Sequence, residues 1–247
     1  MTMILKTRNR LYTREEPTKD AKLIIIYCEG KKREKQYFNY FSEISSKIRL
    51  EVEAPAHHDN TSPYGLYKKA VSHIIKSADN SELKYEKDDE VWFVIDTDKW
   101  GVQIEELRDN CLEQENWNVA QSNPCFEVWL FYHLFSFESF DGMERSKGWK
   151  QYLNTKVAGG FDSKKHTILV KTAIENAKLK FDDTIDVGAT EVFKLAESFY
   201  PFVEDKIEKA LNKIEVKILN AETKKVIEES RKEINVEDFS FDKLEQK

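Results

Sequence analysis

The stretch that decides the fold is Leu23-Ile24-Ile25-Ile26-Tyr27-Cys28-Glu29-Gly30. Four consecutive apolar residues, three of them β-branched, predict a strand that is buried on both faces rather than an amphipathic one. The strand runs straight into a carboxylate, Glu29, and then into Gly30, a residue that permits a sharp exit from a strand. We therefore expect a central strand of an α/β sheet that presents Glu29 at its carboxyl end.

A second stretch repeats this design. Val91-Trp92-Phe93-Val94-Ile95 predicts another buried strand, and it ends in Asp96-Thr97-Asp98. Residues two apart on an extended segment point to the same side, so Asp96 and Asp98 can share one ligand. Ligand sites of open α/β sheets form outside the carboxyl ends of the strands. The two strands together predict a rim that carries Glu29, Asp96 and Asp98.

The rest of the chain shows strand and helix periodicities in turn. The first part reads as alternating strands and helices, and the part after Phe137 reads as helices with a break at Gly159-Gly160. We divide the chain into an N-terminal arm or edge segment (1–20), an α/β core (21–136) and a helical C-terminal region (137–247). Beyond the two buried strands, strands are expected at 48–54 and 117–120, and helices after Gly30 and at 63–76, 102–114, 124–135, 164–180 and 190–213.

The pair Asn123-Pro124 is a strong signal for a helix start, with Asn123 as N-cap and Pro124 at the first helical position. The helix that follows, to about Phe135, is apolar all round except for Glu127 and His133. A buried carboxylate needs a partner, which a metal ion, a basic side chain or the helix's own N-terminal amides could supply. Alternatively, Glu127 is a capping-box residue that reaches back to Asn123.

Composition limits the classes of partner. The chain has 247 residues, 40% of them hydrophobic and 34% charged, and a net charge of −6, so as a whole it is not a basic nucleic-acid coat. A nucleic-acid partner would have to meet a local basic patch or bound metal ions. No apolar run approaches membrane-spanning length and no signal-peptide core is present, so we expect a cytoplasmic protein without a membrane partner. The three cysteines show no C-x-x-C pairing, and Cys28 and Cys125 read as buried apolar residues.

Basic residues flank the predicted rim. Lys31, Lys32 and Arg33 open the helix that follows Gly30, where helix N-termini attract anions, and Lys99 follows the Asp-x-Asp. These four are candidates for gripping substrate phosphates; the other reading is a solvated turn. The adjacent His57-His58 are candidate metal ligands, but no third ligand lies at a helical offset from them.

The three rim carboxylates together could bind a divalent metal ion. Hard oxygen ligands suit Mg²⁺ or Mn²⁺, which keep several waters and bridge to substrate phosphates. Such ions can generate the nucleophile and stabilise the leaving oxygen of a phosphodiester. The competing reading is that all three are solvated acids at strand ends.

The motifs resemble those of a known family. Ile26-Tyr27-Cys28-Glu29-Gly30, continued through Glu34 and Tyr37-Phe38, resembles the opening of Toprim domains, and Val94-Ile95-Asp96-Thr97-Asp98 resembles their second motif. The string Ser122-Asn123-Pro124-Cys125-Phe126-Glu127-Val128-Trp129-Leu130 is similar to the RloB family, which includes the AbiLii-type abortive-infection proteins. The resemblance covers about residues 22–200.

This resemblance implies a Toprim-like, mainly parallel sheet flanked by helices, with a helical C-terminal extension. Glu29 would be a metal ligand or general acid/base, Asp96 and Asp98 the metal-binding pair, and Glu34 and Glu127 further acidic members of the site. The implied activity is Mg²⁺- or Mn²⁺-dependent cleavage of DNA or RNA in anti-phage defence, beside an ABC- or AAA-type ATPase encoded alongside.

The chain departs from some relatives of this fold. Primase-type Toprims carry an acid where this chain has Arg33, and this argues against primase or topoisomerase activity. No G-x-x-x-x-G-K-[ST] is present, so no P-loop ATPase is expected in this chain. Two alternatives stay open: an effector that cuts RNA, including tRNA, and a non-catalytic subunit that docks on the ATPase. Assembly with further copies of the chain is a further expectation.

Overall fold

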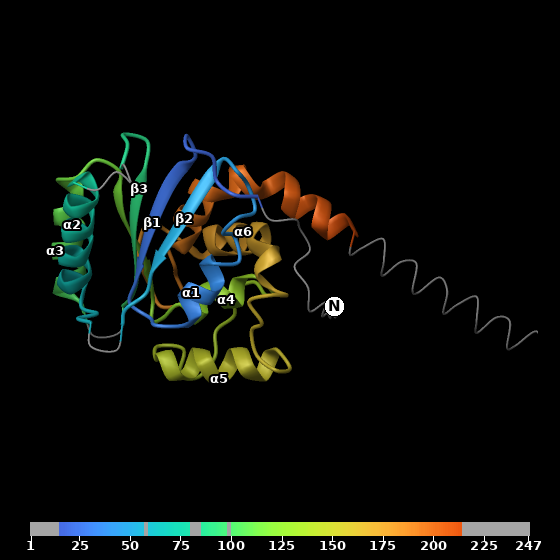
Figure 1. Ribbon diagram of the computed structural model, residues 1–247. Coiled ribbons are helices and arrows are strands. Elements are labelled where there is room, and N and C mark those ends of the chain that lie inside the picture. The colour runs from blue at the N-terminus through green and yellow to red at the C-terminus, as the bar shows by residue number, and fades with distance from the viewer. Residues whose placement is uncertain (1–14, 57–58, 80–84, 98–99, 214–247) are drawn as a thin grey trace, which may run out of the picture. The chain divides into compact units, whose positions relative to one another are not determined.

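The computed structural model describes residues 15–56, 59–79, 85–97 and 100–213 (Figure 1). The chain divides into two compact units, Met1–Lys206 and Ile207–Lys247. Every element named below begins in the first unit; residues 207–213, the described part of the second, are helical. No helix within the described ranges is long and apolar enough to cross a membrane.

The first unit is built on a sheet of four parallel strands. These are β1 (Lys22–Cys28), β2 (Ile48–Glu53), β3 (Glu90–Asp96) and β4 (Trp117–Ser122), in the order β2-β1-β3-β4. Parallel neighbours need crossover connections, and helices supply them here. The predicted α/β class, the parallel sheet and its four strands are confirmed.

The strands are buried on both faces, as their continuous apolar runs predict. Leu23, Ile25 and Tyr27 of β1 join the core under α2 (Pro63–Asp79) and α3 (Val102–Leu112). The alternate residues, Ile24 and Ile26 among them, are fully buried on the other face. That face is covered by α1 (Arg33–Phe38) and α4 (Glu127–Tyr132) (Figure 1).

The helical remainder continues from this second layer. It comprises α5 (Ser146–Lys156), the short 3-10 helix η1 (Thr167–Leu169), α6 (Val170–Lys180) and a helix that begins at residue 192. Gly159 and Gly160 have φ of 84° and 74°, which glycine adopts readily, so the predicted break is confirmed. The helix expected at 164–180 is divided between η1 and α6. An isolated bridge between Ser122 and Thr190 ties this region to the edge of β4.

The predicted helix start at Asn123-Pro124 is wrong. This peptide bond is cis, and α4 begins three residues later, at Glu127. The Asn123 side-chain amide donates to the Ile185 carbonyl at 2.6 Å, and its backbone N–H donates to the Ala189 carbonyl at 2.9 Å. The Asn123 carbonyl, which an N-cap would offer to the first turn of its helix, accepts the Gly188 N–H at 2.8 Å, so Asn123 is bonded to a segment about sixty residues away along the chain. The capping-box role of Glu127 is wrong for the same reason, because no side chain caps α4.

Residues 15–18 lie beside the segment that precedes β2. The Glu15 N–H donates to the Glu43 carbonyl and the Thr18 N–H to the Ser46 carbonyl, both at 2.8 Å. This agrees with the edge-segment reading of the N-terminus, while the basic residues before Glu15 lie outside the described residues.

Candidate functional site: carboxylates at the switch point of the sheet

The strand order reverses between β1 and β3, because β2 follows β1 on one side and β3 and β4 follow on the other. Such a switch point leaves a crevice outside the carboxyl ends of the two strands. Asp96 is the last residue of β3, and Glu29 follows β1 directly, with its N–H donating to the Val94 carbonyl at 3.1 Å. Two of the three predicted rim carboxylates therefore meet at this crevice. The third, Asp98, lies outside the described residues, as does Lys99.

Glu29 is held in place by the neighbouring strand. Its Oε2 accepts the backbone N–H of Asp96 at 3.1 Å, and its Oε1 accepts the indole N–H of Trp100 at 2.8 Å. Hydrogen bonds to an ionised carboxylate are stronger than neutral ones, so both oxygens of Glu29 are oriented before any ligand arrives. Sequence reasoning missed Trp100; the available signal was an indole donor directly after the Asp-x-Asp.

Glu34 lies in the first turn of α1 with its side chain folded over Gly30. A Cβ added to Gly30 would lie 2.1 Å from Glu34 Oε1, a distance that no side chain tolerates. Gly30 does not have a positive φ, so its role here is steric clearance rather than left-handed backbone. The Glu-Gly pair thus admits a second carboxylate, only 6% exposed, against the end of β1.

Asp96 and Glu127 connect the crevice to the last strand. The Phe126 N–H donates to Asp96 Oδ1 at 2.8 Å, and Glu127 is the first residue of α4 and 5% exposed. Because Asp96 is paired with Ser122 in the ladder, the segment after β4 has to pass the carboxyl end of β3. The Ser122–Leu130 string therefore delivers an acid to the same crevice as the two earlier motifs.

Burial and the charges of neighbouring acids raise the pKa of two of these carboxyl groups, Glu34 and Asp96. Burial raises the pKa of Glu34 to about 7, with the charges of Glu127 and Glu29 adding to the effect. Burial also raises the pKa of Asp96 well above its usual range, and Glu34, Glu29 and Glu127 contribute in that order. No ion pair involves Glu34, Asp96 or Glu127 in the part of the chain that the structure describes. We call Glu29, Glu34, Asp96 and Glu127 the acidic cluster; negative charge is concentrated there without a direct counter-charge on the three named acids.

One cation faces this cluster from a separate helix. Lys150 of α5 has its pKa raised, first by Glu127 and then by Cys125, Asp96 and Glu34, while partial burial opposes the shift. Sequence reasoning missed Lys150, because nothing in a lysine beside Trp149 on a charged helix points to a carboxylate twenty-three residues earlier.

A family model now bears on the site. The model described as RloB-like protein matches residues 24–199, about 70% of the chain. The chain belongs to the RloB-like family. No curated protein and no solved structure matches it. The matched range includes the whole acidic cluster and Lys150, and it bears out the resemblance carried by the Ser122–Leu130 string.

The predicted phosphate-binding residues of this RloB-like chain lie on the solvent side of the β1–α1 turn. Lys31, Lys32 and Arg33 are exposed, and the charge of Lys31 helps to lower the pKa of Asp59. The predicted histidine pair, His57-His58, lies outside the described residues.

The acidic cluster is not a preformed metal cage. Within the described ranges, no group of three or more His, Cys, Asp or Glu side chains is arranged to hold a metal ion. Mg²⁺ does not require such a cage, since it keeps several waters and is commonly held by one or two carboxylates together with substrate phosphates. Two acids with raised pKa values, Glu34 and Asp96, fit a site that an added cation would stabilise.

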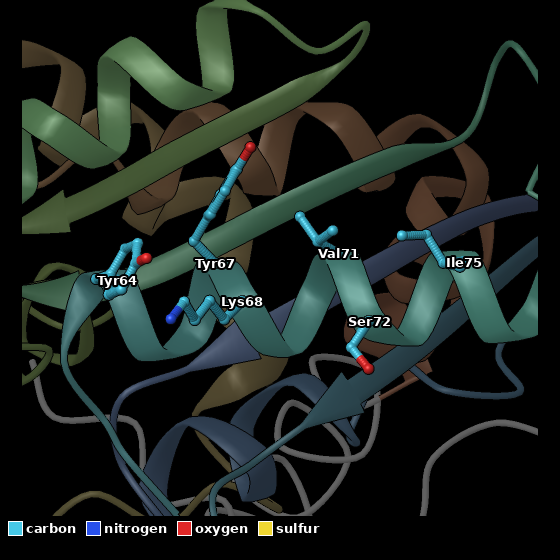
Figure 2. A pocket seen from close by; sticks show the side chains of 6 residues that line it. All are labelled: Tyr64, Tyr67, Lys68, Val71, Ser72 and Ile75. Carbon is cyan, nitrogen blue, oxygen red and sulfur yellow. The ribbon is translucent and has the colours of Figure 1, made fainter.

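The surface hollow in Figure 2 lies elsewhere, along α2. It is lined by residues of that helix alone, and none of them is acidic: Tyr64, Tyr67, Lys68, Val71, Ser72 and Ile75. An open groove without convergent acids or an unpaired buried group offers no chemistry, so the candidate site of this family member remains the sheet edge.

Proposed function

We propose that this RloB-like protein is a metal-dependent endonuclease that hydrolyses phosphodiester bonds of DNA or RNA in anti-phage defence. The observation that carries the proposal is the acidic cluster itself. Acids from the ends of β1 and β3 and from the first turns of α1 and α4 converge at the switch point, although mutual repulsion makes this arrangement costly. Costs of this kind are retained at functional sites.

The residues divide into roles that their surroundings support. Glu29, Asp96 and Asp98 would hold Mg²⁺ or Mn²⁺, and the ion would supply a Lewis acid for the water nucleophile and the leaving oxygen. Glu34, with a pKa of about 7, can both hold and release a proton near neutral pH, which suits a general acid/base. Glu127 adds charge beside Asp96 and Glu34 and thereby tunes both.

An ATPase partner forms part of the proposal. The net charge of −6 disfavours nucleic-acid binding by the isolated chain, so a partner that brings nucleic acid or triggers the site fits this protein. The alternative, a non-catalytic subunit that docks on such an ATPase, predicts no metal dependence at all.

A cleavage assay tests the proposal. Wild type, Glu29→Gln and Glu127→Gln are incubated with plasmid DNA and with total tRNA in Mg²⁺, Mn²⁺ or EDTA, with and without the neighbouring ATPase. Glu105→Gln, a change of an exposed acid on α3, is the matched control. We expect cleavage by wild type and the control that EDTA and both site variants abolish. If the folded wild type cleaves neither substrate in the presence of the ATPase, the nuclease proposal is contradicted and the role of a non-catalytic docking subunit is favoured.

A further inference from the structure

We propose that Lys150 on α5 binds the phosphate of the nucleic-acid substrate opposite the acidic cluster. The inference rests on the proposed nuclease function, and it assigns to the helical C-terminal region a direct contact with substrate. It rests on the placement of α5 and on the absence of an ion pair between Lys150 and the cluster among the described residues.

The placement of α5 is set by packing against α4 and the residues that precede it. Trp149 is fully buried, its ring lies 5.4 Å from that of Phe131, and its indole N–H donates to the Met143 carbonyl at 2.7 Å. The Ser146 carbonyl lies 3.9 Å from the sulfur of Cys125, two residues before Glu127. Lys150 is one helical turn after Ser146, so it lies on the same side of α5 as this contact.

The charges of the cluster act on Lys150, although Lys150 forms no ion pair with it among the described residues. Glu127, Asp96 and Glu34 all favour its charged form, and Lys150 in turn lowers the pKa of Glu34. Yet no carboxylate oxygen lies within the 4.0 Å of an ion pair from its ammonium group among the described residues. Lys150 is exposed and forms no ion pair among the described residues, so its ammonium group is accessible to a ligand from solvent on the side of the cluster.

Phosphate is the ligand that suits this space. A lysine ammonium binds phosphate oxygens as a compact point charge without base specificity, so the ligand class is any phosphodiester. A phosphate next to unneutralised carboxylates is repelled, so it should bind well only when a divalent cation occupies the cluster. Phosphate binding through Lys150 and cation binding at the cluster are therefore expected to be coupled.

The alternative role for Lys150 is that of a plain counter-ion for the cluster. The two roles predict different effects of removing Lys150 on nucleic-acid affinity. Removal of a counter-ion leaves nucleic-acid affinity unchanged, whereas removal of a phosphate ligand weakens it and, by relieving repulsion, lets a divalent cation bind at least as tightly as before.

The test uses the full chain with Lys150→Met, Lys150→Arg and, as the matched control, Lys147→Met, which changes an exposed lysine on the same helix. Anisotropy measures the binding of a short fluorescent single-stranded oligonucleotide in Ca²⁺ and in EDTA. Calorimetry measures Mn²⁺ binding without nucleic acid. Circular dichroism confirms that each variant is folded.

We expect Lys150→Met to weaken oligonucleotide binding in Ca²⁺ about tenfold, the scale of one charge-assisted contact. Lys147→Met should change it less than about twofold, as for a peripheral charge. Lys150→Arg should retain most of the affinity, and Mn²⁺ should bind Lys150→Met no more weakly than wild type. Equal oligonucleotide affinity of wild type and Lys150→Met would overturn this inference and leave the nuclease standing. The oligonucleotide measurements are repeated with the neighbouring ATPase present. A wild type that then binds Mn²⁺ but no oligonucleotide would overturn this inference, and one that binds neither would overturn both.

Discussion

A single buried acid, Glu191, and the acidic cluster lie near the carboxyl ends of neighbouring strands, and their charges are compensated in opposite ways. Glu191, 5% exposed, lies beside β4 and is fully compensated: its Oε2 accepts Arg108 at 2.5 Å and its Oε1 accepts Lys194 at 2.9 Å. Gln121 completes the arrangement by accepting a second hydrogen bond from Arg108 at 2.9 Å. The acidic cluster at the β1–β3 switch point concentrates four acids, and Glu34, Asp96 and Glu127 form no ion pair among the described residues.

The difference in ion pairing between Glu191 and the acidic cluster separates an acid that stabilises the fold from acids that do not. A carboxylate that stabilises structure is buried together with its cations, because an unpaired buried charge costs several kcal/mol. Glu34 and Asp96 of the acidic cluster have no ion-pair partner among the described residues, and burial with like charges raises the pKa of both. Such an arrangement is stable only because the surrounding sheet and helices impose it, and an incoming cation would relieve it.

The largest expected effect is a pH dependence of stability that comes from the acidic cluster. The pKa of Glu34 is about 7 in the folded protein against an ordinary value of 4.5, so between these values the folded chain holds a proton that the unfolded chain has released. The free energy of unfolding should therefore fall as pH rises from about 4.5 to about 7, by about 3 kcal/mol at most. Urea unfolding at several pH values measures this. Glu34→Gln should flatten the profile, and an unchanged profile in that variant would show that Glu34 is not the cause.

The next effect belongs to the compensated acid. Glu191→Gln removes the charge that neutralises Arg108 and Lys194, and we expect a loss of about 2 kcal/mol in the free energy of unfolding, below the full cost of an unpaired buried charge because Arg108 is 28% exposed. Chemical denaturation measures it, with Glu113→Gln on the surface as control. A loss below about 0.5 kcal/mol, the usual range of surface substitutions, would break the contrast between Glu191 and the acidic cluster.

Glu127→Gln should have the opposite sign. Replacing one of several mutually repelling acids by a neutral amide of the same shape should raise the free energy of unfolding by about 1 kcal/mol at pH 8 in EDTA. The gain should disappear at pH 5, where Glu34 is protonated. If both Glu127→Gln and Glu191→Gln lower the free energy of unfolding, a cation compensates the charge of Glu127. The distinction between the acidic cluster and Glu191 would then be wrong.

The smallest effect concerns orientation. Trp100→Phe removes the indole donor to Glu29 Oε1 and leaves the backbone donor from Asp96 in place. We expect cleavage to slow about fivefold, the scale of one ordinary hydrogen bond, with little change in substrate affinity. Trp92→Phe, at a tryptophan whose indole donates to Glu90 instead, is the control. A loss of affinity at constant rate would place Trp100 in substrate binding rather than in the orientation of Glu29.

Much of the fold followed from local patterns. Continuous apolar runs mark β1 and β3 because strands buried on two faces need apolar residues at every position. The acids that end these runs, Glu29 and Asp96, were predictable as neighbours because parallel strands end at one edge. The start of α4 was not predictable, because Asn123 hydrogen-bonds with residues near Ile185 and Ala189 rather than with the turn that follows it.

The sequence by itself determined the α/β class, the parallel strands and the acids at their ends, since these depend on periodicity and on which residue follows a strand. Only the tertiary structure decided which acids are compensated and which are not. Glu127 and Glu191 look alike as sequence, and they differ because Arg108 approaches one while Lys150 stops short of the other. The Lys194 partner of Glu191 is a local pair three residues away, but Arg108 is tens of positions away, and no local pattern encodes its distance from the carboxylate.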